Sequence, residues 1–254
     1  MKPHGRLLGA AWLFIGVLTG LSLWLGHSSV PQGLAERPDG GASLRVGFAT
    51  EVPYAYLDAQ GQVTGEAPEI FRRVARQVGV QDIHWVHMDF ASLLPELQLG
   101  RIDAIAAGMF IPPERQRLAA FTRPTAAVRP ALIVRTGESR LPLKPLLADL
   151  ERTGDLRWLT VHAAAEHELL TQAGVSSARM ATVSEAGRGL RAVADGLADA
   201  LAISAVTAWQ LVANHPEWPL EVRTLGDATA GLPAFVFRRA DQPLRDAFDQ
   251  TLLT

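Results

Sequence analysis

Arg115 is the residue of this sequence whose position best suits the binding of an anion. It follows two prolines in the stretch AAGMFIPPER (106–115). Two prolines in a row stop a strand, and the second suits the first turn of a helix, so we expect Arg115 in that opening turn. Backbone N–H groups and the helix dipole favour an anion there, and a guanidinium can bind a carboxylate through two parallel hydrogen bonds. The alternative is a surface arginine in a solvated helix.

A second set of residues could hold a cation. Glu51 ends the first predicted strand, where it could pair with a cationic nitrogen or lie exposed in a loop. Tyr54, Phe90 and Phe110 each stand at the edge of a predicted strand or at the start of a predicted helix. Three rings around one small site would form a cage for a delocalised or quaternary cation. Ordinary core packing is the alternative for each ring.

Metal and thiol chemistry find little support in the sequence. His162 and Glu166 are four residues apart and His167 follows, but His162 is predicted to end a strand and there is no HExxH pattern. We therefore expect no metal and no cofactor. Glu166 or His167 could contact a ligand instead. The chain has no cysteine, which excludes disulfides, thiolate catalysis and zinc–thiolate sites.

The elements that must position these side chains alternate between strands and helices. The pattern predicts strands at 44–50, 83–88, 102–109, 131–137, 157–163, 178–183, 198–204 and 233–239. It predicts helices at 68–80, 90–100, 166–174, 187–196, 205–215 and 241–253, and a loop with a hairpin at 51–67. The periodicity lapses after the turn at 110–115 and restarts near 131. The sequence therefore predicts two α/β units.

Composition and the N-terminus limit where such a protein could act. The chain has 254 residues, a formal net charge of -2 and 48% hydrophobic residues, so a nucleic-acid partner, which would call for a basic stripe, is not expected. Lys2 and Arg6 precede an uncharged apolar run at 7–26, which indicates an export signal or a retained membrane anchor. Residues 27–43 are expected to be a linker, and the working part is expected outside the cytoplasm.

Four motifs together give the chain a family resemblance. They are EVPYAYLDAQGQVTGEAPEI (51–70), FASLLPELQLGRIDAIAAGM (90–109), IPPERQRLAAFT (111–122) and DGLADALAIS (195–204). In this order and spacing they resemble family 3 of the bacterial extracellular solute-binding proteins, which serve ABC importers of amino acids and related solutes. The sequences of residues 65–70 and 106–110 are most similar to the ectoine/hydroxyectoine-binding branch.

The resemblance implies two α/β lobes, each a mixed sheet flanked by helices, with ligand held in the cleft of a type II periplasmic-binding-protein fold. Lobe 1 is expected at 44–126 plus 233–254 and lobe 2 at 131–227. The hinge crossings are expected at 127–130 and 228–232. The periodicity lapses at both crossings, and clefts between α/β units are usual ligand sites.

The resemblance also implies roles for individual residues. The arginine matching Arg115 binds the ligand's carboxylate in the family, an acid often stands at the position of Glu51, and aromatic residues form the cation cage in the ectoine branch. The ligand site is accordingly expected to comprise Glu51, Tyr54, Phe90, Gly108, Phe110, Arg115, Ala165, Glu166 and Ser204, with no catalytic residue.

Three departures from the family's amino-acid binders bear on the ligand. Those proteins usually have Thr at the positions of Pro112 and Ala165, and Asp at the position of Ser204, where it holds the α-ammonium. Without that Asp a buried primary ammonium would be poorly paired. The sequence therefore favours a zwitterion whose positive charge is spread or shielded, such as a cyclic amidine or a betaine.

The expected protein is a monomeric periplasmic component that captures a small zwitterion by hinge closure and presents it to the membrane subunits of an ABC importer, without catalysis. One alternative is a membrane-anchored sensor domain of the same fold. Another is a periplasmic dehydratase that uses Glu51 or Glu166 as its acid, which would need an acid–base pair within reach of one substrate.

Overall fold

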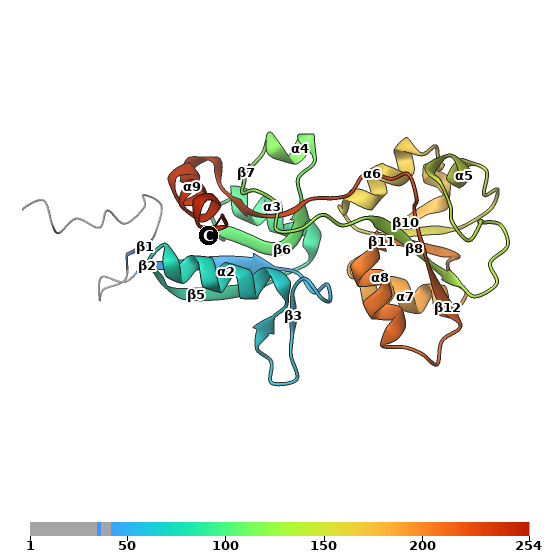
Figure 1. Cartoon of the computed structure of the whole chain (residues 1–254), viewed down its shortest axis with the longest axis horizontal. Coiled ribbons are helices and arrows are strands. Elements are labelled where there is room, and N and C mark those ends of the chain that lie inside the picture. The colour runs from blue at the N-terminus through green and yellow to red at the C-terminus, as the bar shows by residue number, and fades with distance from the viewer. Residues whose placement is uncertain (1–34, 37–41, 254) are drawn as a thin grey trace, which may run out of the picture. The chain divides into compact units, whose positions relative to one another are not determined.

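The computed structural model describes residues 35–36 and 42–253 (Figure 1). The predictions for residues 1–26, and for most of the linker, fall outside the described residues. Within the described ranges, no helix combines the length and the apolar character that a membrane crossing requires.

The first sheet carries the N-terminal half of the predicted site. Its strands run in the order β1-β2-β6-β13-β7, and β5 also pairs with β2. They are β1 (Ala35–Glu36), β2 (Ala42–Phe48), β5 (Val80–His87), β6 (Ala104–Phe110), β7 (Ala120–Phe121) and β13 (Pro233–Phe237). Strands β5 and β6 pair with β2 in parallel, whereas β13 is antiparallel to β6. A small hairpin of β3 (Tyr56–Leu57) and β4 (Val63–Thr64) follows β2.

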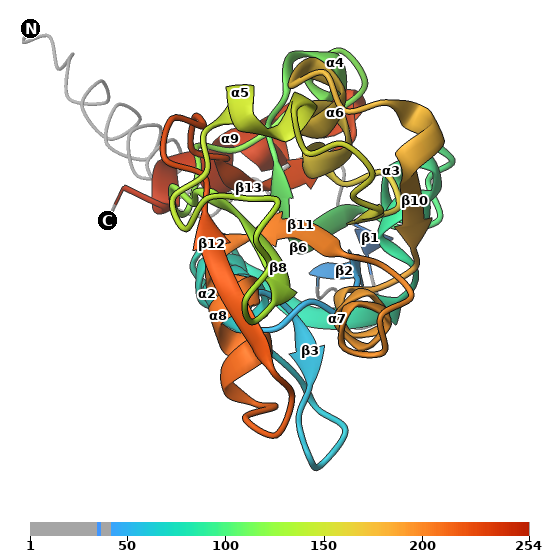
Figure 2. The same ribbon diagram turned by 90° about the vertical axis from the view of Figure 1, so that its right-hand side faces the viewer.

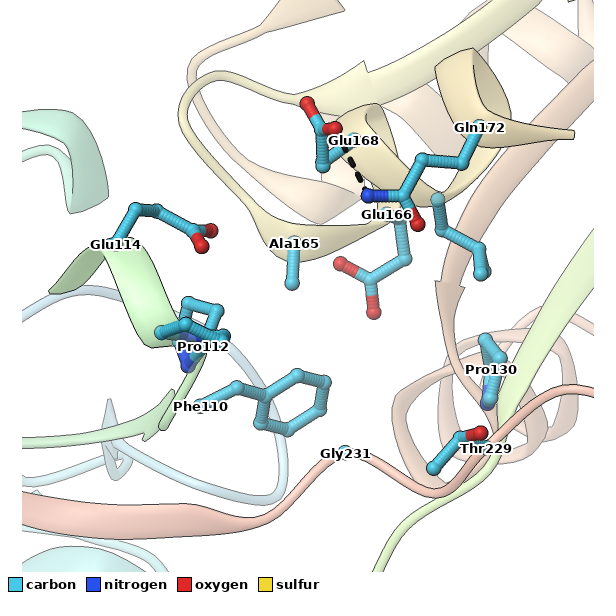
Figure 3. A pocket seen from close by; sticks show the side chains of 12 residues that line it. Phe110, Pro112, Glu114, Pro130, Ala165, Glu166, Glu168, Gln172, Thr229 and Gly231 are labelled. Carbon is cyan, nitrogen blue, oxygen red and sulfur yellow. Dashed lines mark hydrogen bonds between the residues drawn. The ribbon is translucent and has the colours of Figure 1, made fainter. Parts of the chain in front are cut away.

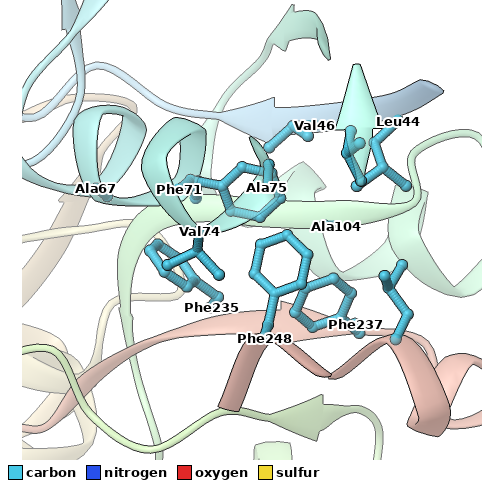
Figure 4. Close-up of a cluster of buried hydrophobic side chains, with 13 residues drawn as sticks. Leu44, Val46, Ala67, Phe71, Val74, Ala75, Ala104, Phe235, Phe237 and Phe248 are labelled. Atoms are coloured by element: carbon cyan, nitrogen blue, oxygen red, sulfur yellow. The ribbon is translucent and has the colours of Figure 1, made fainter. Parts of the chain in front are cut away.

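Helices cover both faces of this sheet. Side chains along β6 alternate between the two faces, so each face presents apolar groups that a helix buries. These helices are α2 (Glu66–Gln77), α3 (Phe90–Gln98) and α9 (Gln242–Thr251). Ala104 and Ala106 face a cluster with aromatic rings from α2, β13 and α9 (Figure 4). Ile105 and Met109 face the opposite cluster, which includes leucines of α3. The buried sheet fixes where β2 and β6 end, and the predicted site residues lie at those ends.

The second sheet has the order β10-β9-β11-β8-β12 (Figure 2). Its strands are β8 (Pro130–Arg135), β9 (Trp158–Val161), β10 (Met180–Val183), β11 (Ala200–Ser204) and β12 (Leu220–Thr224). Strands β10, β9 and β11 are mutually parallel, and β8 is antiparallel to β11 and β12.

This sheet is also covered on both faces. Its helices are α5 (Leu147–Glu151), α6 (Ala165–Gln172), α7 (Ala186–Ala194) and α8 (Ala205–Ala213). Leu190 of α7 and Ala208 of α8 pack in one cluster. Leu150 of α5 and Leu170 of α6 pack in the other. Each sheet therefore has its own core, as the two predicted α/β units require.

Two segments connect the sheets, one between β7 and β8 and the other between β12 and β13. They run antiparallel at one point, where Val128 and Gly231 exchange backbone hydrogen bonds of 2.9 and 2.7 Å. Both residues lie inside the predicted crossings, 127–130 and 228–232. The predicted two-lobed class of fold, with a mixed sheet in each lobe, is confirmed, and the lobe and hinge boundaries stay a prediction.

Candidate functional site

Eight of the nine predicted ligand-binding residues line one small cavity between the two sheets' ends. We call it the inner cavity. It is lined by Glu51, Tyr54, Phe90, Gly108, Phe110, Arg115, Val161, Ala164, Ala165, Glu166, Ala202 and Ile203. It leaves about 20 Å³ for the centres of water molecules, which is room for about one water. The side chains of the two lobes therefore nearly fill it.

Arg115 reaches across this cavity from the first lobe to the second. It lies in α4 (Pro113–Gln116), a single turn that begins after Pro112, as the sequence predicts. Its Nη2 donates to the carbonyl of Ala163 at 2.5 Å and its Nη1 donates to the carbonyl of Phe110 at 3.3 Å. Its guanidinium lies 5.6 Å from the centre of the Phe90 ring. Because α4 is only one turn, the guanidinium itself is the main positive charge here, rather than a helix dipole.

The Ala163 carbonyl accepts from the Arg115 guanidinium a hydrogen bond that a ligand carboxylate could accept instead. Ala163 has a φ of 60°, a left-handed conformation that is uncommon for a residue with a Cβ. This backbone turn directs its carbonyl oxygen to Arg115. Burial lowers the pKa of Arg115, and the nearby Glu166 carboxylate opposes that shift. A partly desolvated guanidinium held by two neutral carbonyls would gain from exchanging that of Ala163 for a carboxylate.

Glu51 makes the second connection between the lobes. It follows β2, and its Oε1 accepts a hydrogen bond of 2.8 Å from the hydroxyl of Thr207, in the first turn of α8. The hydroxyl of Ser204, the N-cap of α8, donates to Thr207 Oγ1 at 2.9 Å. The pKa of Glu51 is raised to about 7, first by burial and then by the charge of Glu166, while the Thr207 hydrogen bond acts in the opposite direction.

Glu166 is the acidic residue that the second lobe contributes. It lies in the first turn of α6, is 6% exposed, and its pKa is raised to about 7 by burial. Its own backbone N–H and the charge of Arg115 act in the opposite direction. No ion pair to Glu166 exists within residues 42–253. Glu51 and Glu166 thus place two mutually repelling carboxylates beside one guanidinium.

Tyr54 is held against β6 by a glycine. Gly108 has a φ of +66°, and a Cβ on it would lie 2.8 Å from Cγ of the Tyr54 ring. The Tyr54 hydroxyl is buried and makes no hydrogen bond with the described residues, although Ser204 lies close enough to lower its pKa. Burial is the larger effect and raises that pKa. Tyr54 therefore offers an unused hydroxyl at the inner cavity.

The two phenylalanines come from different elements of the first lobe. Phe90 begins α3 and packs against hydrophobic clusters of both lobes. Phe110 ends β6 and lies over the crossing segment at Gly231, where a Cβ would come within 2.3 Å of Phe110 Cε2. Gly231 therefore gives the Phe110 ring its place between the lobes.

Sequence reasoning missed one polar residue, Thr207. The predicted residue Ser204 does not line the inner cavity; its hydroxyl donates to Thr207, which in turn donates to Glu51. Thr207 was hidden because it lies within the apolar helix pattern AVTAWQL, where a threonine carries no sign that its hydroxyl faces another lobe. The Ser-x-x-Thr spacing at an N-cap is the signal that could have found it. His162 and His167 bond to Thr182 and Thr160, and no cluster of residues in the described ranges could hold a metal ion.

Taken together, the inner cavity has a guanidinium at one wall, two carboxylates, a free tyrosine hydroxyl and two phenylalanine rings. Such a set can bind a small molecule that carries both an anionic and a cationic group. Because residues of both lobes contribute, binding would favour the closed arrangement of the lobes.

This chain has relatives among known proteins at the levels of family, sequence and structure. Residues 44–254 match the family described as bacterial extracellular solute-binding proteins, family 3. A probable amino-acid ABC transporter periplasmic-binding protein of Sinorhizobium fredii is 29% identical, with 99% of this chain and 82% of that protein covered. The L-arginine-binding protein of Pseudomonas aeruginosa is 31% identical, over 66% of this chain and 62% of its own length.

Solved structures share the fold. The crystal structure of EhuB in complex with hydroxyectoine superposes with a TM-score of 0.77 at 30% identity, covering 83% of this chain and 82% of that chain. An ancestral arginine-binding protein bound to glutamine superposes with a TM-score of 0.74 at 22% identity, covering 83% and 90%. The second likeness, at that identity, concerns the fold alone.

Proposed function

The chain belongs to family 3 of the bacterial extracellular solute-binding proteins, and from this premise we propose that it captures a small zwitterionic solute for an ABC importer. The resemblance that the four motifs indicate is thereby confirmed. The solute would be an ectoine-like compatible solute or an amino-acid derivative. The protein would act in the periplasm, as a monomer that delivers its ligand to the importer's membrane subunits and does not transform it.

One observation carries the proposal: the inner cavity combines Arg115 with Glu51 and a group of rings within a space bounded by both lobes. In our proposal the ligand's carboxylate displaces the Ala163 carbonyl from Arg115. Its cationic group lies among Phe90, Phe110 and Tyr54, with Glu51 as counter-ion. The ligand thus replaces direct bonds between the lobes with bonds to itself, which is how a ligand can populate the closed state.

The choice of a zwitterion is supported by the relatives and by the cavity. EhuB was solved with hydroxyectoine, and the curated relatives are named as amino-acid-binding proteins. Ser204 is the N-cap of α8, and its neutral hydroxyl supplies no negative charge for an α-ammonium. The carboxylates that line the inner cavity are Glu51 of the first lobe and Glu166 of the second, and they suit a cation that is spread over several atoms.

A thermal-shift screen of ectoine, hydroxyectoine, betaines and amino acids tests the proposal. A ligand present at a hundred times its Kd adds about 2.7 kcal/mol to the free energy of unfolding. Arg115→Ala should remove the shift produced by any carboxylate ligand, because losing one partner of a desolvated charge pair weakens binding by about 2 to 5 kcal/mol. Arg117→Ala is the matched control, since Arg117 is exposed two residues further on. An undiminished shift in Arg115→Ala would refute the assigned site.

One observation favours a second function. Glu51 and Glu166 share the inner cavity and both have a pKa raised to about 7, which is where a general acid or base works best. A dehydratase would use such a pair. Incubation with cyclic hydroxycarboxylates, followed by chromatography for the dehydrated product, distinguishes the two functions: a binding protein returns the substrate unchanged.

A further inference from the structure

A larger cavity adjoins the inner cavity on the side of the crossing segments, and we call it the outer compartment. It offers about 500 Å³ to the centres of water molecules, which is within the range of sites that hold drug-sized ligands. It shares Phe110, Ala165 and Glu166 with the inner cavity (Figure 3). A ligand in the inner cavity could therefore extend into it without leaving the lobes.

The walls of the outer compartment suit a hydrocarbon chain. Pro112 precedes α4 and Pro113 is its first residue, Pro130 begins β8, and Leu169 belongs to α6. With the face of the Phe110 ring, these side chains present carbon atoms and no hydrogen-bond donor. Three or four methylene groups placed against them would lose contact with water, and this burial favours binding.

The charge of the compartment is negative. Glu166 is 94% buried, and Figure 3 shows its carboxylate pointing into the compartment between Phe110 and Pro130, where no ion pair meets it within the described residues. Glu114 and Glu168 lie at the exposed rim, and Glu168 accepts a hydrogen bond from Gln172 at 2.9 Å. No lysine or arginine among the described residues lines the compartment.

We propose that the outer compartment is a second binding compartment, which holds a long arm of the ligand that ends in an amine or a guanidine, with Glu166 as its counter-ion. This inference rests on the proposed function and deepens it. The ligand then carries one carboxylate, at Arg115, and two separated cationic groups, one at Glu51 and one at Glu166. Ectoine and betaines would be incomplete ligands, because they fill only the inner cavity.

Electrostatics supports two cationic groups. With both carboxylates ionised, Glu51, Glu166 and Arg115 together carry a net charge of about −1 by their ordinary ionisation. With a neutral zwitterion that charge is removed when one of the two carboxylates takes up a proton, whereas a ligand with net charge +1 cancels it with both carboxylates ionised. The arm supplies the missing charge next to Glu166, a buried carboxylate that makes no ion pair with the described residues.

Titration calorimetry with arginine and citrulline tests the inference, because the two probes differ mainly in the charge at the end of an arm of similar length. Arginine should bind the wild-type protein at least tenfold more tightly than citrulline. In Glu166→Gln this preference should fall to less than threefold, whereas Glu168→Gln, an exposed neighbour on the same helix, should keep most of it. Circular dichroism checks that both variants are folded.

A second variant tests the space in the outer compartment separately from the charge of Glu166. Thr229 is exposed on the crossing segment and lines only the outer compartment. Thr229→Trp places an indole in the compartment and should weaken arginine at least tenfold while alanine, which has no arm, binds as it does to the wild type. The proposed role of the outer compartment is overturned if arginine and citrulline bind the wild type equally, or if neither variant changes arginine binding. If ectoine binds through Arg115 and arginine does not bind, the proposed function stands and this inference falls.

Discussion

The hydroxyl of Thr207 donates a hydrogen bond of 2.8 Å to Oε1 of Glu51 and so joins α8 of the second lobe to the end of β2 in the first. Residues 156 positions apart in the chain are thereby brought into one polar cluster, which Ser204 extends. The same hydrogen bond lowers the pKa of a carboxylate that burial otherwise raises. Lobe closure and the charge state of Glu51 are therefore coupled.

Thr207→Val should break this connection while keeping the shape of the side chain. Glu51 would lose its donor, so its pKa should rise above about 7, and the closed arrangement of the lobes should become less populated. We expect a loss of about 1 to 3 kcal/mol in unfolding free energy, because a partly buried acceptor is left without a donor. Thr207→Ser keeps the hydroxyl and is the control.

Two measurements decide this prediction. NMR titration of the Glu51 carboxyl carbon reports its pKa, and small-angle scattering reports whether the unliganded lobes open. A Thr207→Val protein whose Glu51 titrates at the wild-type pH would show that the hydrogen bond does not act on the carboxylate.

The stability of the unliganded protein should fall as the pH rises from about 4.5 to above 7. Glu51 and Glu166 have pKa values of about 7, against an ordinary value of 4.5, so the folded state binds their protons more tightly than the unfolded chain does. Stability from this source is fully present below pH 4.5 and is lost as the pH rises through about 7. We expect a decline on the order of 1 to 3 kcal/mol for each carboxylate.

Urea unfolding at several pH values measures this decline. The double variant Glu51→Gln, Glu166→Gln should remove most of it, because an amide does not ionise. All other ionisable groups remain in both proteins and cancel in the comparison. A double variant with the wild-type slope would show that these carboxylates do not cause it.

Much of the fold follows from periodicity in the sequence. The strand at 102–109 is observed as β6 at Ala104–Phe110, and the helix at 68–80 as α2 at Glu66–Gln77. Both have an unbroken pattern, and Gly79 and the two prolines mark their limits. By contrast, β12 was not predicted, because LEVRT alternates over only five residues and its pairing with β8 depends on a distant part of the chain.

The candidate site was predictable only where a residue stands at the end of an element. Arg115 and Phe110 could be placed beside the cleft because the prolines fix the turn between β6 and α4. The hydroxyl of Thr207 and the carbonyl of Ala163 could not be found, because their roles arise when the second lobe meets the first. A local pattern carries no information on which side chains face each other across a closed cleft.

Gly108→Ala should destabilise the protein and weaken ligand binding together. Its φ of +66° disfavours any side chain, and the added Cβ would lie 2.8 Å from Tyr54 Cγ, so the tyrosine ring would have to move. We expect a loss of about 2 to 4 kcal/mol in unfolding free energy, from backbone strain and overpacking together. Gly61→Ala is the control, since Gly61 has a φ of +74° and nothing within 4 Å of the added Cβ.

The difference between these two variants isolates the collision with Tyr54, because both carry the same kind of backbone strain. Chemical denaturation gives the two free energies, and calorimetry gives the affinities. If Gly61→Ala and Gly108→Ala lose equal stability, the Tyr54 ring is not held by the glycine, and its place at the inner cavity is wrong.

Gly231→Ala should alter binding through Phe110. The added Cβ would come within 2.3 Å of Phe110 Cε2, and Gly231 also pairs with Val128 where the two crossing segments meet. The ring must therefore turn toward the cavities that it lines, which narrows both. We expect binding to weaken at least tenfold, or about 1.4 kcal/mol, with a further 1 to 3 kcal/mol lost from stability.

A double-mutant cycle tests whether the ring transmits this effect. Phe110→Leu removes the atoms that collide, so Gly231→Ala should lose much less stability in the Phe110→Leu background than in the wild type. Gly187→Ala, where an added Cβ meets nothing within 4 Å, is the control for the substitution itself. Additive losses would mean that Gly231 acts on the hinge independently of Phe110. The coupling would then have to be sought in the Val128 pairing, because a shift there moves both lobes without touching the ring.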